Sequence, residues 1–357
     1  MAYLELIIYI KYIYMTNKTR KKRAGLKSPR RTKLNKTFKK FNKKGKYPYK
    51  KITKSMALED FNKLKKVDES NWRSIKGIRM VDYGTYKLRV RTKYRGKSNV
   101  ERWNMTSPRE KMLGFAQRLH EGSYNAKGKV KPEEIIRSAI SLAWSTINSM
   151  RPAYAMNMYK AHGATRVLDI TAGWGARMVG AMAANIDYIG IDSNTKLRPA
   201  YNKIKNLMKK EGKSKSNVVL KFQKAETVDF SKLGYYDFVF TSPPYEYLEL
   251  YEGMQKYDGE VGQASSGLKL KGRPEFYDKF LIPTLKSAYK YLPKGKFLCL
   301  NMPESMYDEI KARWKPADKC DQDYMISKRH GSSWKVSERK GKEKVFCWKS
   351  KYFLWQK

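Results

Sequence analysis

Residues 165–192 read TRVLDITAGWGARMVGAMAANIDYIGID, and the pattern of this segment indicates the fold class. It begins with an apolar segment over residues 165–170, which predicts a strand, and continues through the glycine-rich turn TAGWGA. Residues 177–184 have a helical composition, and a second apolar segment over residues 187–191 ends at Asp192. A strand, a glycine-rich turn, a helix and a second strand in this order are typical of a parallel β-α-β unit.

The same alternation continues toward the C-terminus. The patterns predict helices over residues 196–210 and 277–291, and strands over residues 217–222, 236–240 and 296–300. Two more strands, over residues 324–328 and 344–348, flank a connection rich in Gly, Ser and Lys and predict an antiparallel hairpin. The predicted fold class is therefore α/β, with a Rossmann-like, doubly wound, mostly parallel sheet, a C-terminal hairpin and a basic N-terminal extension.

The basic residues are concentrated on the N-terminal side. The chain has 357 residues, with 77 Lys and Arg against 33 Asp and Glu, a formal net charge of +44. Residues 1–100 hold 31 basic and 6 acidic residues, and residues 11–54 hold 19 basic residues and no acidic one. An AT-rich coding sequence, which favours lysine codons, explains so uneven a distribution less well than a polyanionic partner does. Nucleic acid is the expected partner, ahead of a membrane or an acidic protein.

Composition divides the chain into three regions. Residues 1–54 are expected to form a disordered basic arm that binds phosphates, because residues 18–51 within them have few apolar residues and no regular period. Residues 55–150 are expected to form a basic nucleic-acid-binding region, and residues 151–357 the α/β domain. Within the middle region the patterns predict a β-like segment over residues 82–94 and helices over residues 109–120 and 132–150.

Several protein classes are disfavoured by the sequence. The cysteines Cys299, Cys320 and Cys347 are isolated, which argues against a disulfide scaffold or a zinc ribbon, and no cluster of metal ligands is evident. Residues 1–15 are apolar but too short and too interrupted for a membrane span, and they make a poor signal peptide. Met15 stands where the basic residues of the arm begin and is a candidate start of translation. These features predict an intracellular protein without a membrane or metal partner.

Two motifs follow neighbouring predicted strands and suit a nucleoside ligand. Residues 169–175 read DITAGWG, and glycines at such a turn let the backbone approach a ligand closely. Asp192 follows the next strand, 17 residues after Gly175. An acid at that place accepts hydrogen bonds from ribose hydroxyls, although it can also cap the following helix.

A third motif, TSPPY over residues 241–245, directly follows the predicted strand YDFVF. Its two prolines remove two backbone donors and fix φ, so the backbone carbonyls there are left without strand partners. With Ser242 before the prolines and Tyr245 after them, the segment predicts a small acceptor pocket beside a stacking platform. An exocyclic amino group needs such acceptors, because its lone pair is delocalised into the base until its N–H groups are hydrogen-bonded.

Together these motifs resemble the S-adenosylmethionine-dependent amino-methyltransferases of nucleic acids, which carry an (Asp/Asn/Ser)-Pro-Pro-(Tyr/Phe/Trp) motif. The segments VLDITAGWGARMVGA, YIGID, FTSPPY and LNMPE are similar to a group of viral and phage DNA methyltransferases. The resemblance covers about residues 151–302. It implies a class I methyltransferase fold, S-adenosylmethionine as the cofactor and DNA as the partner.

The resemblance also implies roles for individual residues. Those expected at the cofactor are Asp169, Thr171, Gly173, Gly175, Asp192 and Glu226. Asp192 would hold the ribose, and Glu226 or its neighbour would lie against the adenine amino group. Those expected at the target base are Ser242, Pro243, Pro244 and Tyr245, with Tyr245 stacking on a flipped base. The turn departs from the family's usual Asp-x-Phe-x-Gly-x-Gly start, because Ala172 and the bulky Trp174 lie within it.

Serine before the two prolines is associated in this family with N4-cytosine more than with N6-adenine. Either product would arise by direct displacement on the methyl sulfonium. RNA stays open as the substrate, as does a non-catalytic nucleic-acid-binding protein that keeps the fold. A viral protein of this kind would act in the nucleus or cytoplasm of the infected cell or enter the virion. The oligomeric state is not indicated.

Three secondary features lie near these motifs. Residues 246–273 are long and glycine-rich and are expected to close over the site as a mobile loop, with Glu249, Tyr251 and Arg273 as substrate contacts. Arg151 precedes the first strand and is a candidate cofactor contact, together with Pro152. Arg177 is expected to begin its helix, and a phosphate contact is the less favoured alternative.

Overall fold

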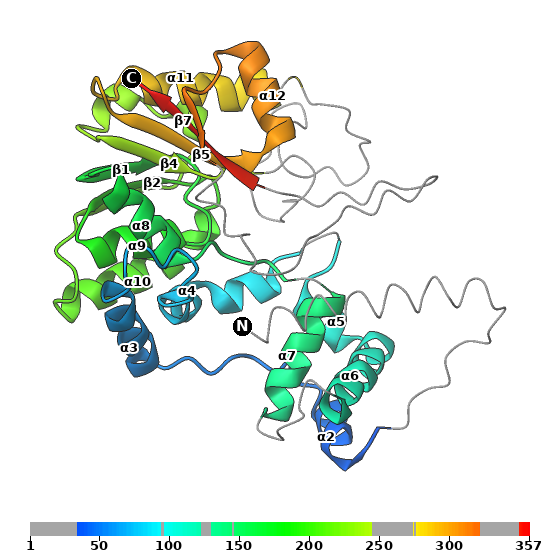
Figure 1. The fold of residues 1–357 in the computed structure, drawn as a ribbon. Coiled ribbons are helices and arrows are strands. Elements are labelled where there is room, and N and C mark those ends of the chain that lie inside the picture. The colour runs from blue at the N-terminus through cyan, green and yellow to red at the C-terminus, as the bar shows by residue number, and fades with distance from the viewer. Residues whose placement is uncertain are drawn as a thin grey trace. The chain divides into compact units, whose positions relative to one another are not determined.

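The protein is described by a computed structural model, which covers residues 34–93, 96–122, 130–144, 146–244, 274, 276–321 and 350–357. The chain forms two compact units (Figure 1). We call one the helical unit, from residues Met1–Lys51 and Lys87–Asn148, and the other the sheet unit, from residues Ile52–Tyr86 and Ser149–Lys357.

Within the described residues, the sheet unit is built on a seven-stranded sheet of order β3-β2-β1-β4-β5-β7-β6. The strands are β1 (Arg166–Asp169), β2 (Asp187–Ile191), β3 (Val218–Lys221), β4 (Phe238–Thr241), β5 (Phe297–Pro303), β6 (Lys319–Asp321) and β7 (Ser350–Gln356). The first five in the sheet order pair in parallel, whereas β7 runs antiparallel to both β5 and β6. The predicted α/β fold class with a C-terminal antiparallel pair is thus confirmed.

The antiparallel pair is formed by other residues than those expected. The strands predicted over residues 324–328 and 344–348 lie outside the described residues. The pairing that is described joins Lys319–Asp321 to the end of the chain, where Cys320 is opposite Phe353. Tyr352, Phe353, Leu354 and Trp355 are all buried, which is why this strand inserts between β5 and β6.

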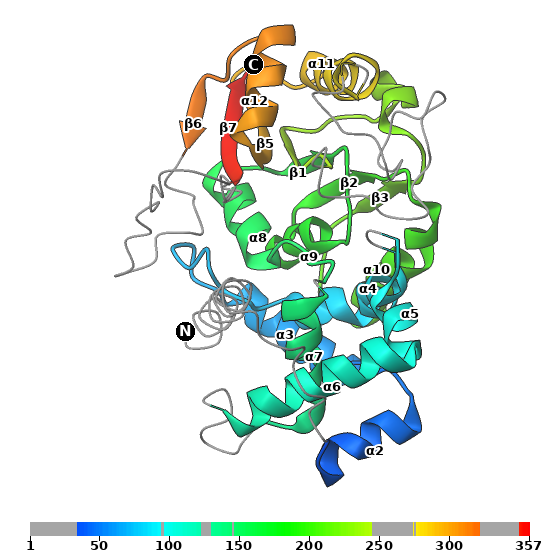
Figure 2. The same cartoon turned by 90° about the vertical axis from the view of Figure 1, so that its right-hand side faces the viewer.

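Helices cover both faces of the sheet (Figures 1 and 2). On one face lie α8 (Pro152–Ala161), α9 (Ala176–Ala184) and α10 (Arg198–Lys210), and on the other lie α11 (Ile282–Lys290) and α12 (Glu304–Arg313). Short 3₁₀ turns precede or follow them: η2 (Thr195–Leu197), η3 (Ala225–Thr227) and η4 (Phe230–Lys232). A π-helical turn, η5 (Phe276–Leu281), leads into α11. Proline in the first turn of α8, α10 and α11 favours these starts, because its missing N–H has no intrahelical partner there.

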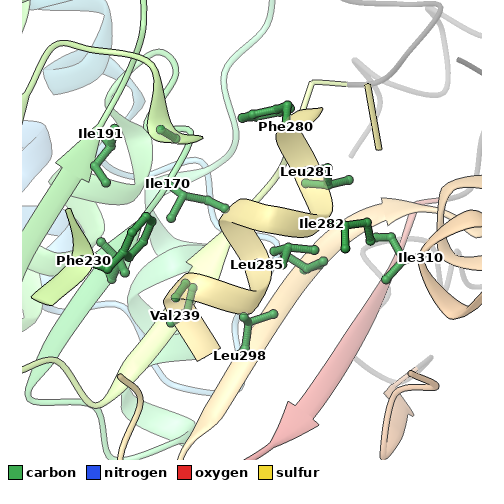
Figure 3. Packing of buried hydrophobic residues seen from close by; sticks show 14 of the residues in the cluster. Ile170, Ile191, Phe230, Val239, Phe280, Leu281, Ile282, Leu285, Leu298 and Ile310 are labelled. Atoms are coloured by element: carbon green, nitrogen blue, oxygen red, sulfur yellow. The ribbon is translucent and has the colours of Figure 1, made fainter. Parts of the chain in front are cut away.

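The core beneath α11 consists of aliphatic and aromatic side chains. Leu285 of α11 packs in one cluster with Val239 of β4 and Leu298 of β5 (Figure 3). Leu281 and Phe230 belong to the same cluster. Burying each side chain of this size contributes about 1.5–3 kcal/mol, so this layer holds β4 and β5 in place beneath the loops that follow them.

Residues 52–86 belong to the sheet unit, which differs from the boundary expected at residue 150. The segment contains α3 (Lys54–Lys65) and most of α4 (Ile78–Arg91). The connection between these two helices is held by the buried Asn157 of α8. Its Nδ2 donates to the carbonyls of Asp68, at 3.2 Å, and Glu69, at 2.9 Å. Gly77 has φ +87°, and a Cβ there would come within 2.9 Å of Pro152 Cβ. The segment is therefore a packed part of the α/β unit.

The β-like prediction for residues 82–94 is wrong, because this stretch is helical as far as Arg91. The residues of α4 that are buried recur at helical spacing: Met80, Val81, Asp82, Thr85, Tyr86 and Val90. The apparent alternation came from Leu88 and Val90 between basic residues. Tertiary packing of the stripe, rather than the local alternation, decides the conformation here.

The helical unit contains α2 (Lys36–Lys44), α5 (Asn99–Asn104), α6 (Thr106–Glu121) and α7 (Pro132–Ala143). The helices predicted over residues 109–120 and 132–150 are present, although the second ends at Ala143. Helix α2 lies within residues 1–54, which were predicted to be a disordered arm. Asn35 caps it through Oδ1, Gly45 ends it with φ +59°, and Phe38 is fully buried. One buried aromatic ring and two good caps thus outweigh the high charge.

No helix in the described part of the chain is both long and apolar enough to cross a lipid bilayer.

Replacing Asn157 with alanine tests whether residues 52–86 are structural in the sheet unit. The change leaves two carbonyls without their buried donor, and we expect the free energy of unfolding to fall by about 1–3 kcal/mol in urea denaturation. Lys160→Gln is the matched control, because its ion pair joins the exposed Glu69 to a partly exposed lysine at the surface, and surface pairs contribute about 0–1 kcal/mol. Equal losses in both variants would contradict this role.

Candidate functional site

The predicted site residues follow the carboxyl ends of neighbouring parallel strands. In the sheet β1 lies between β2 and β4, and the chain order reverses at this point. Asp169 ends β1 and the glycine-rich turn up to Gly175 follows it, Asp192 follows β2, and Ser242–Pro244 follow β4. Open α/β sheets bind their ligands at this kind of reversal, outside the carboxyl ends of the strands. Glu226 lies one strand further away, in the turn after β3, and is partly exposed.

The glycine-rich turn is held in a left-handed conformation. Gly173 has φ +64° and Gly175 has φ +85°, values that favour glycine. The N–H of Gly173 donates to Asp192 Oδ2 at 2.7 Å, and its carbonyl accepts from the hydroxyl of the buried Tyr201 at 3.0 Å. A Cβ built on Gly173 would make ordinary van der Waals contacts, at 3.7 Å from the carbonyl oxygen of Thr171 and 3.9 Å from Arg177 Nη2.

Asp192 joins the turn after β1 to the turn after β2. Its Oδ1 accepts from the N–H of Asn194 at 2.8 Å, in addition to the bond from Gly173. The side chain is buried, and burial raises the pKa of Asp192 from 3.8 to about 6 although the two N–H donors act in the opposite direction. A carboxylate has about four lone-pair positions, so this group keeps acceptor capacity for a ligand.

Asp169 is the most enclosed charged group of the site. Its carboxylate accepts hydrogen bonds from Arg177 Nε at 2.6 Å, Tyr188 OH at 2.6 Å, Thr241 Oγ1 at 2.9 Å and the N–H of Thr171 at 3.3 Å. The side chain is fully buried. Four donors from β2, β4, α9 and the turn itself therefore use most of its acceptor capacity within the protein.

Arg177 supplies the positive charge that balances Asp169. It lies in the first turn of α9 and is buried, and its Nη2 donates to the carbonyl of Thr171. Burial alone would lower the pKa of Arg177, but the ion pair with Asp169 raises it above its ordinary value. A buried pair of this kind is neutral as a whole and holds the turn from both sides.

A hydroxyl bridge connects the glycine-rich turn to the segment after β4. Thr171 Oγ1 lies 2.5 Å from Thr241 Oγ1 and donates to the carbonyl of Ser242 at 3.0 Å. Thr241 also donates to Asp169. Two hydroxyl protons serve these three short contacts, so two of the three can be filled at one time. The bridge fixes the start of the Ser242–Pro244 segment against the turn.

The proline segment is partly open. Thr241 and Pro243 are buried, whereas Ser242 and Pro244 are partly exposed. Tyr245 and the predicted mobile loop, with Glu249, Tyr251 and Arg273, lie outside the described residues. Arg151, another predicted contact, donates through Nη1 to the carbonyl of Arg73 at 2.5 Å, and burial lowers its pKa.

The structure brings together most of the predicted residues and adds others. Arg177 was expected to begin a helix, with a phosphate contact as the less favoured alternative, and its ion pair with Asp169 was not expected. The bridging role of Thr241 and the contacts of Tyr188 and Tyr201 were not expected either. A sequence signal for Arg177 exists, because it is the lone charge in the otherwise apolar segment ARMVGAMAA. Such a residue needs a buried acid, and Asp169 lies eight positions earlier. In the described part of the chain, no three acidic, histidine or cysteine side chains are grouped as metal ligands.

Comparisons with known proteins return structural likeness only. No protein-family model matches this chain, and no curated protein matches it. The solved structures similar to it include TehB from Haemophilus influenzae, at 14% identity over 61% of this chain and 66% of that chain, with a TM-score of 0.35. Another is an S-adenosylmethionine-dependent methyltransferase from Clostridium acetobutylicum ATCC 824, at 10% identity over 54% and 65%, with a TM-score of 0.31.

A third is the SAH-bound Podospora anserina methyltransferase PaMTH1, at 13% identity over 47% of this chain and 56% of that chain, with a TM-score of 0.27. This chain spans less than two thirds of the length of each of these structures. Likeness at this level assigns neither an activity nor a substrate to the chain.

Breaking the buried ion pair tests how strongly the turn depends on it. Arg177→Met leaves the Asp169 carboxylate buried without its cation, and we expect the free energy of unfolding to fall by about 3–5 kcal/mol. The double variant Arg177→Met with Asp169→Asn removes both charges and should recover part of that loss. Urea denaturation of the two variants measures the difference, and no recovery in the double variant would contradict the pairing.

The raised pKa of Asp192 predicts a pH dependence. The folded chain holds the Asp192 proton up to about pH 6, whereas the unfolded chain holds it only up to about pH 3.8. Protonation of Asp192 therefore stabilises the folded state, and this contribution to the free energy of unfolding is complete below pH 3.8. It is lost as the pH rises through 6. We therefore expect the unfolding free energy of the wild type, relative to Asp192→Asn, to decrease from pH 4 to pH 7. A constant difference across that range, or a carboxyl titration near pH 4 by NMR, would contradict the assignment.

Proposed function

We propose that this protein transfers the methyl group of S-adenosylmethionine to an exocyclic amino group of a base in DNA, with N4 of cytosine favoured over N6 of adenine. The observation that carries the proposal is the hydroxyl bridge from Thr171 to Thr241 and Ser242. It joins a glycine-rich turn suited to a nucleoside cofactor to a Ser-Pro-Pro segment suited to an amino group. Two reactants held by two linked segments gain the rate advantage of proximity and orientation.

The residues at the strand ends fit the cofactor. The backbone of the turn at Gly173 would face its methionine portion, and the spare acceptor positions of Asp192 would take the ribose hydroxyls. Glu226, near the end of β3, would lie toward the adenine amino group. When bound, S-adenosylmethionine supplies an electrophilic methyl group on a positively charged sulfur. Gly175 and Thr171 complete the turn that would face it.

Asp169 would act on the cofactor through the turn. Its carboxylate is occupied by the side chains of Arg177, Tyr188 and Thr241, so it is a positioning residue that sets the backbone of Thr171 and the hydroxyl of Thr241. Since the ion pair is buried and neutral overall, it leaves little net charge near a cationic cofactor.

The segment after β4 would activate the target amino group. The carbonyl of Ser242 accepts from Thr171, which fixes the backbone at the start of the segment. The Ser242 hydroxyl and the carbonyl of Pro243 would then accept from the two N–H groups of the base. Pro243 and Pro244 contribute no competing donors. Tyr245 would stack on a base turned out of its helix, where such stacking contributes about 1–3 kcal/mol.

Nucleic acid as the partner rests on charge. The formal net charge of +44 and its concentration before residue 100 suit a polyanion bound mainly through phosphates. Such binding is sequence-independent and weakens with salt. It would raise the local concentration of the substrate at the site.

The proposal is tested with full-length protein, methyl-labelled S-adenosylmethionine and separate pools of duplex DNA, single-stranded DNA and RNA. Each pool is digested to nucleosides and analysed by mass spectrometry. We expect label on N4-methylcytosine, or on N6-methyladenine, in DNA. Label in RNA alone would replace the proposed substrate, and no label in any pool would contradict methyl transfer to nucleic acid.

A serine variant links the activity to the site. Ser242→Ala removes one acceptor from the amino group, and we expect the labelling rate to fall by about tenfold to hundredfold. The matched control is Ser287→Ala on α11, which should keep the wild-type rate. Helix α11 lies on the other side of the sheet from α9, the helix that follows the glycine-rich turn. Equal rates in the two variants would exclude the Ser242 hydroxyl as an acceptor for the amino group.

A further inference from the structure

Helix α2 of the helical unit separates its charges from its packing residues. Phe38 on one side is fully buried and lies edge-on to the ring of His120, with 5.6 Å between centroids. The side chains of α2 that are exposed, among those described, are Lys36, Thr37, Lys39, Lys40 and Lys43. Because residues three and four apart share a helix face, the four lysines form one stripe, which we call the lysine face.

The opposite side of α2 is anchored to α6. The N–H of Asn35 donates to Gln117 Oε1 at 2.9 Å and its Nδ2 to Glu121 Oε1 at 3.3 Å. At the other end, Asn42 Nδ2 donates to Glu110 Oε1 at 3.4 Å, and Arg109 Nε donates to Asn42 Oδ1 at 3.0 Å. Contacts at both ends hold the helix in a fixed orientation on α6.

These anchors also explain why the lysine face is not neutralised. Glu110 and Glu121, acidic residues of α6, are turned to the asparagines of α2. In the part of the chain that the structure describes, no acidic side chain pairs with Lys36, Lys39, Lys40 or Lys43. The four lysines sit at (i, i+3) and (i, i+4) spacings, where like charges destabilise a helix. A bound polyanion would remove that repulsion.

We propose that the lysine face of α2 is a preformed docking surface for the phosphate backbone of duplex DNA. This inference rests on the proposed function for the choice of DNA. The stripe from Lys36 to Lys43 is about 10 Å long, and a duplex presents about six phosphates over that length. Lysine binds phosphate as a flexible point charge, so the surface fits any sequence. A membrane fits less well, because a helix that lies on lipid inserts apolar side chains and the exposed face of α2 has none.

The test compares variants of the full-length chain without cofactor. In the α2 variant Lys36, Lys39, Lys40 and Lys43 are all replaced by Gln. In the matched control the same charge is removed from the exposed Lys279, Lys286, Lys290 and Lys294 of the sheet unit. A third variant replaces the α2 lysines by Arg. Affinity for a 30-base-pair duplex is measured by fluorescence anisotropy over a series of salt concentrations.

Removing the partner of one phosphate lowers the salt slope by about 0.9 and the affinity at 0.1 M salt by about tenfold. We expect the α2 variant to lose its contacts with two or more phosphates of the duplex, so its affinity should fall by about a hundredfold or more. The affinities of the control and of the Arg variant should stay near that of the wild type. Circular dichroism should show the α2 variant to be folded and at least as heat-stable, since repulsion is removed. A control whose affinity falls as much as that of the α2 variant would overturn the proposal.

Two parallel measurements separate this inference from others. Binding of the variants to single-stranded RNA and to phosphatidylserine vesicles is measured as well. If the α2 variant loses binding to either of these while its affinity for the duplex is unchanged, the proposal is also overturned. Methyl transfer is assayed at saturating DNA in the same preparations. Loss of duplex binding in the α2 variant, together with a wild-type chain that labels no nucleic acid, would keep the docking surface and reject the proposed activity.

Discussion

The candidate site depends on one buried carboxylate, that of Asp169 at the end of β1. Donors from a neighbouring strand on each side, from the first turn of α9 and from the glycine-rich turn all converge on it. Removing a charged group of this kind from water is costly unless its hydrogen bonds and its counter-ion are both provided. Arg177 provides the counter-ion, and by also binding the Thr171 carbonyl it fixes the turn to the helix that follows.

The consequence is that two loops from separate strands behave as one surface. Thr241 ends β4 and Thr171 belongs to the turn after β1, and their hydroxyls meet beside the carboxylate. Asp192 ties the third segment to the same turn through the N–H of Gly173. A ligand bound against the turn and a group held by Ser242 would then be positioned relative to each other by hydrogen bonds rather than by flexible loops.

Much of the sheet unit could be predicted from the sequence, because short apolar segments alternate with amphipathic ones from residue 165 to residue 300. The glycines and Asp192 were also predictable, since their spacing follows the strand ends. The partners of Asp169 were harder to predict, because Thr241 is 72 positions away and the local sequence pattern does not indicate that the two residues are close in space. The same holds for Asn157 and the carbonyls of residues 68 and 69, which place residues 52–86 in the sheet unit. Local alternation misled the assignment of α4, and high charge hid α2.

The proposed function requires the linked strand ends to bind S-adenosylmethionine. Isothermal titration of its product, S-adenosylhomocysteine, into the wild-type chain tests this most directly, because it needs neither a substrate nor turnover. We expect saturable binding at about one site per chain, weakened at least about tenfold in Asp192→Ala and unchanged in Ser242→Ala. No binding to a folded wild-type chain, or binding that Asp192→Ala leaves unaltered, would contradict it.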